Sequence, residues 1–432
     1  MSIAIAEKLR KAAFYGLDAA KGGKFKEQLK QIEDTLSSRR NMEDFQERAR
    51  RRLFEVASSS RRYAAISSDT PLAELPILSK EELRSEPTAF ETLAAREPGL
   101  VHVSTSGSYG VPMQLALTPQ KKARQQAEAL YFGTWAQYDV GTSHLYLRSA
   151  TPKSKLKLRL QNEWFSSTDN PSEEWIDEQL ELLRNKRIRA IIGYPSTAAL
   201  MASRSLAREI NPRVYALNGV ITIGESLSEK SRSVVEQGFG AVCLSRYSAE
   251  EVGTIAAECP EYKKHHVNEA GFIVEVLGMD SDSPVGVGEL GRVVVTDLFS
   301  HAMPLIRYDI GDMAVLGADC ACGRPTMVLD RIEGRIVEML TDASGASLSP
   351  YFINPIMNNV EGVSRYQLAQ TGSKDFELRV VMAGPDLPGR VLAHLKEKLG
   401  ADSQIQIRRT EEIPALPSGK RPYVVNEWRV AK

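Results

Sequence analysis

Two groups of polar residues in this sequence have types and spacings that could do chemistry. The first is the glycine- and hydroxyl-rich run VSTSGSYGVP at residues 103–112. Glycines let backbone N–H groups turn towards an anion, and hydroxyls add hydrogen-bond donors without adding charge. A triphosphate needs such donors, although Ser/Gly turns of this composition also occur in loops that bind nothing. Phosphate binding and a plain surface turn are therefore the two interpretations of this run.

The second group combines sulfur and imidazole side chains. Cys259 is followed by His266, and the closely spaced Cys320 and Cys322 come later in the chain. Three thiolates and one imidazole suit a tetrahedral zinc ion, and a closed set of four ligands suits a structural site. Unligated buried cysteines are the alternative. The remaining cysteine, Cys243, lies in an apolar segment and is expected in the core.

The composition is that of an ordinary globular chain. The 432 residues are 42% hydrophobic and 25% charged, with 55 basic and 55 acidic side chains. This balance gives no reason to expect nucleic acid or an anionic membrane as an obligate partner. No apolar run approaches the ~20 residues of a membrane span, and the amino terminus is a poor signal peptide. We therefore expect a cytoplasmic protein without nucleic-acid or membrane partners.

Hydrophobic periodicity predicts the elements that must position these groups. Residues 1–65 have a polar helical pattern, and Ser79 is expected to cap a helix that begins at Lys80, with Glu82 as its capping-box partner. From 139 to about 260, apolar runs alternate with amphipathic helices, which predicts a parallel sheet covered on both faces. Ligands of such sheets gather beyond the carboxyl ends of the strands. The loops expected at that rim are 103–112, 193–196, 224–225 and 247–253.

The pattern changes twice further along the chain. Residues 270–315 predict antiparallel strands with Gly-rich turns, and residues 340–432 predict alternating strands with a helix at 388–399. The expected fold is α/β: a large N-terminal domain of parallel sheets with covering helices and a β-rich subdomain, then a small mobile α+β domain. We expect the N-terminal domain over residues 1–334 and the C-terminal domain over residues 335–432.

Four patches occur in a characteristic order: STSGSYGVP, YSAEEVG (247–253), RYDIGD (307–312) and PSGK (417–420). Their order and spacing resemble the adenylate-forming superfamily, and the details are most similar to its phenylacetate–CoA ligase-like branch. The stretches LPILSKEELR, GYPS, AAECP and CACGR extend this resemblance over nearly the whole chain. It implies ATP-dependent activation of a carboxylic acid to an acyl-adenylate, then transfer to coenzyme A with release of AMP. The expected acid is aryl or short acyl.

The resemblance also implies roles for individual residues. Glu251 would hold Mg²⁺ on the phosphate oxygens of ATP, and Lys420 would bridge the attacking carboxylate and the α-phosphate. Asp312 would accept the ribose hydroxyls, a role that suits an acceptor-only carboxylate. The other implied nucleotide-binding residues are Thr105, Ser106, Gly107, Ser108, Gly110, Gly224, Glu225, Tyr247, Ser248, Arg331 and Arg335. Some family relatives bind zinc through residues similar to Cys259, His266, Cys320 and Cys322.

Three positions depart from the family pattern. Tyr109 replaces a second hydroxyl of the phosphate loop, and Val111 replaces a lysine that this branch often carries. Val337 stands where the polar hinge residue is usual, so the hinge location is expected but not its usual pivot. These departures leave a catalytically degenerate nucleotide-binding homologue as one alternative. Another is an adenylate-forming enzyme that passes the acyl group to an amine or a carrier protein.

The acid-binding pocket is the least legible part of the sequence. By resemblance it lies between the 131–138 helix, the 142–150 segment, the Tyr194-Pro195 pair and the 224–225 turn. Its candidate lining residues are Tyr131, Phe132, Trp135 and Tyr194, although aromatics at helical spacing are also typical of a core. Relatives in this branch are often dimers, so a homodimer is one assembly that the resemblance allows.

Overall fold

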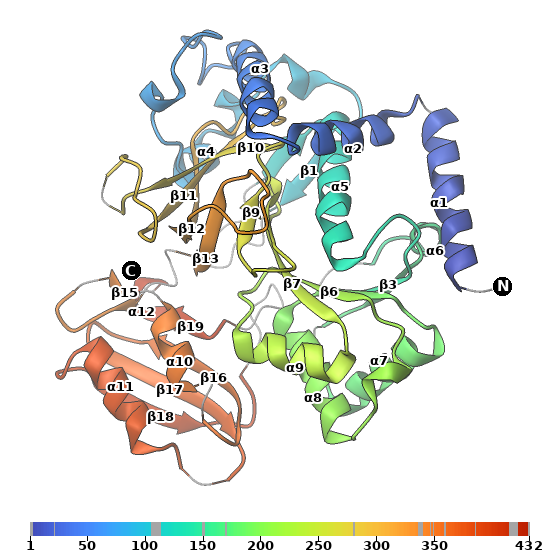
Figure 1. Cartoon of the computed structure of the whole chain (residues 1–432). Coiled ribbons are helices and arrows are strands. Elements are labelled where there is room, and N and C mark those ends of the chain that lie inside the picture. The colour runs from blue at the N-terminus through green and yellow to red at the C-terminus, as the bar shows by residue number, and fades with distance from the viewer. Residues whose placement is uncertain are drawn as a thin grey trace.

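The computed structural model describes most of the chain (Figure 1). The described residues are 3–20, 22–104, 114–148, 152–168, 171–279, 281–335, 340–345, 347–348, 350–357, 360–384, 386–413 and 422–430. No helix within them is long and apolar enough to cross a bilayer.

Three helices open the chain: α1 (Ile3–Ala20), α2 (Lys24–Thr35) and α3 (Arg39–Ala57). They confirm the helical pattern expected there. The predicted cap is also present, because the Ser79 hydroxyl accepts a hydrogen bond from the Glu82 backbone N–H at the start of α4 (Lys80–Ser85). Among the described contacts, the Glu82 carboxylate accepts from Arg62 rather than closing the capping box.

A single 11-stranded sheet forms the centre of the N-terminal part. Its parallel half has the order β4-β3-β5-β6-β7. These strands are β3 (His144–Leu147), β4 (Glu163–Ser166), β5 (Ala190–Gly193), β6 (Gly219–Ile223) and β7 (Val242–Ala249). On one face their apolar side chains pack with α7 (Glu173–Asn185), α8 (Pro195–Ala207) and α9 (Glu229–Phe239), and Cys243 is fully buried there. Near the other face lie α5 (Pro119–Gly133) and the short helix η4 (Thr134–Ala136).

The antiparallel half continues the same sheet in the order β10-β11-β12-β13-β9-β8. Its strands are β8 (Gly253–Glu258), β9 (His265–Val267), β10 (Phe272–Leu277), β11 (Leu290–Asp297), β12 (Tyr308–Leu316) and β13 (Val328–Arg335). The hairpin strands β1 (Val101–Ser104) and β2 (Gln114–Leu117) form a separate ladder that flanks residues 105–113. The α/β fold class is confirmed, with the β-rich region sharing a sheet with the parallel strands.

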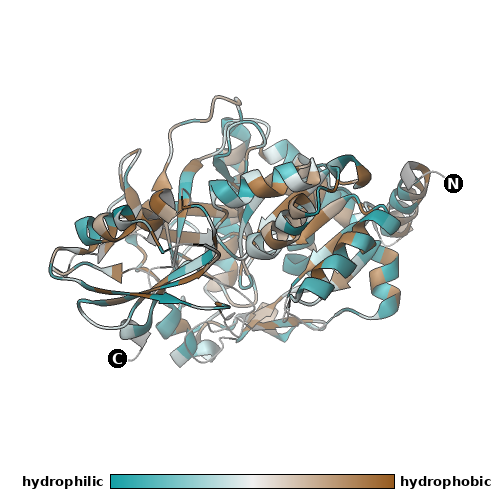
Figure 2. Ribbon diagram, turned by 90° about the horizontal axis from the view of Figure 1, so that it is seen from below, coloured by the Kyte–Doolittle hydropathy of each residue, from teal (hydrophilic) through white to brown (hydrophobic). Residues whose placement is uncertain are grey.

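The C-terminal part has its own core and its own sheet, in the order β18-β17-β16-β19. These strands are β16 (Val363–Gln370), β17 (Asp375–Met382), β18 (Gln404–Arg409) and β19 (Val424–Asn426). They accompany a strand pair, β14 (Leu340–Thr341) with β15 (Ser347–Leu348), and the helices α10 (Asn354–Met357), α11 (Gly389–Leu399) and α12 (Glu427–Val430). Figure 2 shows this sheet at the end of the molecule opposite the N-terminus.

The C-terminal part contacts α9 of the N-terminal part through polar groups. The Ser231 and Tyr423 hydroxyls are 3.2 Å apart, and Lys230 Nζ donates to the Val363 carbonyl at 3.4 Å. Polar contacts are common between domains of one chain, and the mobility of the C-terminal part stays a prediction. The expected boundary between residues 334 and 335 falls at the end of β13 and stays a prediction.

Candidate functional site

Tyr247 and Asp312 meet across the sheet although four strand-to-strand steps separate β7 from β12. The Tyr247 hydroxyl donates a hydrogen bond to Asp312 Oδ2 at 2.8 Å. In the β12–β13 ladder Asp312 lies opposite Arg335, whose side chain is outside the described residues. The structure thus brings together Tyr247, Asp312 and the backbone of Arg335, three residues that are predicted to bind the nucleotide.

Glu251 lies just beyond β7 and is buried. Its Oε1 accepts a hydrogen bond from the Tyr308 hydroxyl at 3.3 Å and is 3.5 Å from Lys80 Nζ. Burial is the main cause that raises the pKa of Tyr308, and the nearby Glu251 carboxylate adds to it, so this phenol remains a donor. A buried carboxylate beside one ammonium can act as a hard oxygen ligand for a cation that also binds phosphates.

Lys80 is a residue that the sequence interpretation missed. It starts α4 two residues after Leu78. The Leu78 N–H donates to the Arg307 carbonyl at 2.8 Å, and the Leu78 carbonyl accepts from the Asp309 N–H at 2.9 Å. This bridge holds the start of α4 against β12. The only sequence signal for Lys80 was its place in the motif LPILSKEELR. The motif does not show that Lys80 lies beside Glu251 in the fold.

The Gly224-Glu225 turn ends β6 as predicted. Gly224 has φ +75°, a left-handed conformation that glycine adopts without a Cβ penalty. Glu225 Oε2 then accepts a hydrogen bond from the Ser196 backbone N–H at 3.2 Å, in the first turn of α8. A carboxylate at a helix N-terminus is favoured by the orphan N–H groups there. The GYPS and GE stretches are therefore connected in space.

Of the remaining predicted nucleotide-binding residues, Ser248 and Arg331 lie within the described part of the chain, and the phosphate-loop residues lie outside it. Ser248 follows Tyr247 at a register irregularity between β7 and β8, and the largely exposed Arg331 pairs with Glu333, with Nε to Oε1 at 3.0 Å. Next to Glu251, Glu250 forms an ion pair with Arg148. Outside the described residues lie Thr105, Ser106, Gly107, Ser108, Tyr109, Gly110, Val111, Val337 and Lys420.

The predicted acid-pocket aromatics lie in two places. Tyr131, Phe132 and Trp135 pack on one another with ring-centroid distances of 5.0–6.4 Å. Trp135 also lies 5.8 Å from the His266 ring, and the Arg324 guanidinium stacks over it at 4.5 Å. Tyr194 instead follows β5 at the carboxyl edge of the parallel strands. The three helical aromatics thus border the Cys/His group, and their role in acid binding stays a prediction.

The structure brings Cys259, His266, Cys320 and Cys322 together, with their ligand atoms all within 4.8 Å of one another. Cys322 Sγ is 3.3 Å from His266 Nε2, close to the ~3.5–3.8 Å that separates ligands of a tetrahedral zinc ion. The Thr326 hydroxyl contacts His266 Nδ1 at 2.7 Å, which orients Nε2 towards the sulfurs. We call these four residues the Cys/His cluster.

Electrostatics at the Cys/His cluster favour ligand-ready forms of two members. Burial, and secondly the Arg324 charge, lower the pKa of His266 to about 4, which keeps the imidazole neutral. Burial opposes the thiolate of Cys322, but hydrogen bonds from the Arg324 backbone and side chain help to lower its pKa. Burial raises the pKa of Cys320 to about 11. The donor set and its geometry fit a structural zinc ion.

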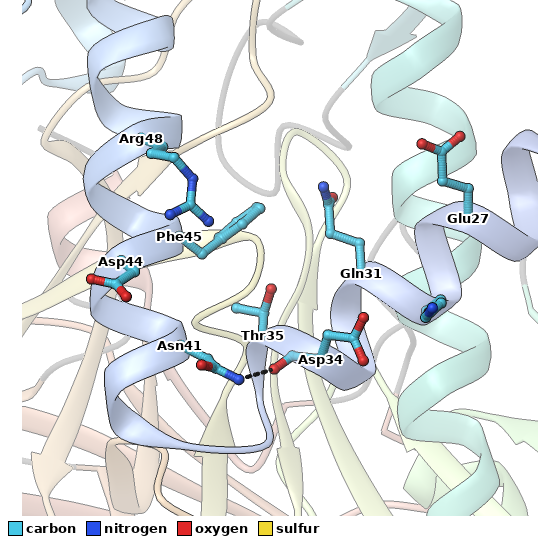
Figure 3. A pocket seen from close by; sticks show the side chains of 9 residues that line it. Glu27, Gln31, Asp34, Thr35, Asn41, Asp44, Phe45 and Arg48 are labelled. Atoms are coloured by element: carbon cyan, nitrogen blue, oxygen red, sulfur yellow. Dashed lines mark hydrogen bonds between the residues drawn. The ribbon is translucent and has the colours of Figure 1, made fainter.

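A separate hollow of about 380 Å³ lies between α2 and α3 (Figure 3). Charged and amide side chains line much of it, including Glu27, Asp34, Asp44 and Arg48, and Asn41 Nδ2 donates to the Asp34 carbonyl at 3.0 Å. It contains none of the predicted site residues. The described part of the candidate site is therefore built at strand ends rather than around this hollow.

Comparison with known proteins gives relatives in sequence. The chain is 27% identical to a phenylacetate-coenzyme A ligase of Thermus thermophilus over 268 residues, which is 57% of this chain and 60% of that relative. It is 20% identical over 368 residues to protein CapK of Staphylococcus aureus, which covers 82% of this chain and 80% of CapK. The alignment to the Thermus ligase thus spans about 60% of that relative. No protein-family model matches the chain.

Comparison of structures gives the fold. A 2-hydroxyisobutyryl-CoA ligase in the postadenylation state superposes with a TM-score of 0.65 at 17% identity, over 92% of this chain and 88% of that one. ATP-bound MatB of Rhodopseudomonas palustris gives a TM-score of 0.55 at 15% identity, over 74% and 65% of the two chains. The resemblance indicated by the motifs is confirmed: the chain has the fold of adenylate-forming enzymes and resembles the phenylacetate–CoA ligase-like branch of that superfamily.

Proposed function

We propose that the protein activates a carboxylic acid with ATP to an acyl-adenylate and transfers the acyl group to coenzyme A, releasing AMP. The observation that carries this proposal is the meeting of two strands: Tyr247, near the carboxyl end of β7, contacts Asp312 of β12, and Glu251, just after β7, contacts Tyr308 of the same strand β12. Tyr247, Asp312 and Glu251 suit a base, a ribose and a cation on phosphates, in that order. The sequence similarity to phenylacetate-coenzyme A ligases supports the same chemistry.

In this proposal no protein nucleophile takes part. The acid carboxylate attacks the α-phosphorus of ATP and pyrophosphate leaves; a thiolate then attacks the acyl carbon and AMP leaves. Catalysis consists of positioning and charge neutralisation. Lys420 provides the positive charge between the carboxylate and the α-phosphate, and movement of the C-terminal part exchanges this lysine for the thiol.

Two metal ions belong to the proposal. Glu251 would hold Mg²⁺, which neutralises phosphate charge, while Lys80 remains beside the same carboxylate. Cys259, His266, Cys320 and Cys322 would hold a structural Zn²⁺. The zinc ion would tie β9 and the segment following β8 to the loop at residues 320–322, so it contributes to stability rather than to the reaction.

Carboxylate-dependent pyrophosphate release, measured over aryl and aliphatic acids with and without coenzyme A, tests the proposal. We expect release with at least one acid and a thioester only when coenzyme A is present. Pyrophosphate release without thioester formation would favour an amine or a carrier protein as the acyl acceptor. ATP binding without release for any acid would favour a degenerate nucleotide-binding protein.

A further inference from the structure

The carboxyl edge of the parallel strands carries a row of side chains on one face. The ladders place Tyr146 beside Ile192, Ile192 beside Ile221, and Ile221 beside Leu244. Because residues two apart in a strand share a face, the next row towards the carboxyl edge is Arg148, Tyr194, Ile223 and Arg246. Ile223 and Arg246 are indeed direct partners in the β6–β7 ladder. Two arginines thus stand on one face, at the edge where parallel sheets bind ligands.

The two arginines of this row differ in their partners. Arg148 forms an ion pair with Glu250. The Arg246 side chain has neither an ion pair nor a hydrogen bond to any residue that the structure describes, and its Nε is buried without an acceptor. Burial lowers the pKa of Arg246, and its electrostatic neighbours are the phenols of Tyr146 and Tyr138. Burial in turn raises the pKa of Tyr138 to about 12, so this hydroxyl stays neutral.

The three buried arginines Arg124, Arg232 and Arg307 have carboxylate partners, whereas Arg189, like Arg246, has a buried Nε without a partner among the described residues. Arg232 makes a bidentate pair with Glu258 at 2.6 and 2.8 Å, Arg307 makes one with Glu275 at 3.0 Å, and Arg124 pairs with Glu128 at 2.9 Å. Arg246 is partly buried and its Nε has no acceptor among the described residues. A guanidinium withdrawn from water without a partner is costly. Arg246 is therefore a cation in need of an anion.

That anion is not expected to be the nucleotide. Successive residues of a strand face opposite sides of the sheet, so Arg246 points away from Tyr247, which contacts Asp312. Arg246 shares its face with Leu244, Ile221 and Ile192, which pack against Trp135 and Tyr138. Apolar side chains, phenols and one guanidinium form a lining that suits an organic acid with a charged end.

We propose that Arg246 is the counter-ion of a second carboxylate on the acid substrate, so that the protein selects dicarboxylic acids over monocarboxylic ones. This inference rests on the proposed activation of a carboxylic acid. The reacting carboxylate faces the nucleotide site, and the second one accepts both N–H groups of one guanidinium edge, the geometry in which arginine binds carboxylates best. Tyr138 and Tyr146 then supply neutral hydrogen-bond donors beside that pair.

Acids matched in carbon skeleton test this selection. Pentanedioate against pentanoate and terephthalate against benzoate are compared by kcat/KM for pyrophosphate release in the wild type, Arg246→Met and Arg246→Lys. We expect the wild type to prefer the dicarboxylic member, and Arg246→Met to lose about 10–100-fold on it while keeping or gaining on the monocarboxylic member. Arg246→Lys keeps the positive charge but not the bidentate guanidinium geometry, so its kcat/KM on the dicarboxylic acid should lie between those of the wild type and Arg246→Met.

Arg189→Met is the matched control. Arg189 also has a buried Nε without a partner among the described residues, but it precedes β5 at the opposite, amino-terminal end of the parallel strands. It should leave the preference between acids unchanged. The melting midpoint adds a structural readout: Arg246→Met should keep or raise it, because the change removes an unpaired buried charge.

Calorimetric binding of the same acids without ATP separates this inference from the proposed function. If no acid releases pyrophosphate but dicarboxylates bind in a way that Arg246→Met abolishes, the proposed function fails and the role of Arg246 stands. If monocarboxylic acids react as well as dicarboxylic ones in the wild type, or Arg246→Met weakens both classes alike, the inference is overturned. Failure of every dicarboxylate to bind overturns it as well.

Discussion

The Cys/His cluster and the proposed nucleotide site are built on opposite principles. The four cluster side chains converge on one point with their ligand atoms within 4.8 Å of one another. Asp312 and Glu251 in the nucleotide site are instead each held by another protein group, the Tyr247 hydroxyl and the Tyr308 hydroxyl with Lys80. A site that releases its ligand in every turnover benefits from protein groups that bond its carboxylates while the ligand is absent. A structural site benefits instead from ligand atoms that face one another, while contacts such as Thr326 on His266 Nδ1 orient the ligands.

The largest expected effect is on catalysis at the proposed nucleotide site. Lys420→Ala removes the charge that would stabilise the adenylation transition state, so the rate of pyrophosphate release should fall by about 10²–10³-fold with ATP binding retained. Lys398→Ala on α11, an exposed lysine next to Glu397, is the control and should leave the rate unchanged. Equal rates for the wild type and Lys420→Ala would remove the catalytic role and favour a degenerate binding protein.

A smaller effect tests whether Asp312 exchanges partners as the comparison requires. Asp312→Asn removes the charge that would accept the ribose hydroxyls, and ATP affinity should fall by about 10–100-fold. Tyr247→Phe keeps the ring but removes the hydroxyl that bonds Asp312 Oδ2, and the loss should stay within about 3-fold because the ribose replaces that bond. Calorimetric titration with ATP measures both. A larger loss for Tyr247→Phe than for Asp312→Asn would contradict this exchange.

These two predictions rest on residues that were recognisable from the sequence for different reasons. Tyr247, Glu251 and Asp312 were recognisable through the resemblance of the motifs YSAEEVG and RYDIGD to a family. The Gly224-Glu225 turn directly follows an apolar run, and period and punctuation place such strand ends well. The Ser79 cap was equally local. Lys80 and Arg246 were missed, because their importance depends on which strand returns beside them. Neither the Leu78–Tyr308 bridge nor the β6–β7 register can be read from the residues next to it in the sequence.

The same limit applies to the aromatics and to the sheet. Helical spacing could not tell whether Trp135 faces an acid or the His266 ring, since both are compatible with one buried helix face. The antiparallel strands were predicted as a subdomain because the alternation of apolar and polar residues along a strand shows only that one of its faces is exposed. It does not report that β8 pairs with β7 and so joins both halves into one sheet.

Thr326→Val tests the Cys/His cluster without changing any of its four ligand residues. The change removes the hydroxyl that contacts His266 Nδ1 at 2.7 Å, and partners of this kind typically contribute 10–100-fold to metal affinity. We expect purified wild-type protein to hold about one zinc per chain, and the variant to lose it to a chelator at about 10–100-fold lower chelator concentration. Thr326→Ser should behave as the wild type. Adenylation by zinc-loaded Thr326→Val should be unchanged, and a slower rate would tie the cluster to the reaction.

The smallest expected effect distinguishes three of the four cysteines by reactivity in chelator-treated protein. The thiolate is the nucleophile, and burial raises the pKa of Cys243 to about 12 and that of Cys320 to about 11, while that of Cys322 is lowered. At pH 7–8 an alkylating reagent should therefore modify Cys322 first. Raising the pH should accelerate Cys320 and Cys243 up to their pKa values, whereas the rate at Cys322 levels off earlier. Peptide mass mapping over time measures this order, and zinc should protect Cys322 without changing Cys243. Early modification of Cys243 would show that the α8–α9 face of the sheet opens more readily than the cluster, and would reverse the contrast between a closed structural site and the rest of the fold.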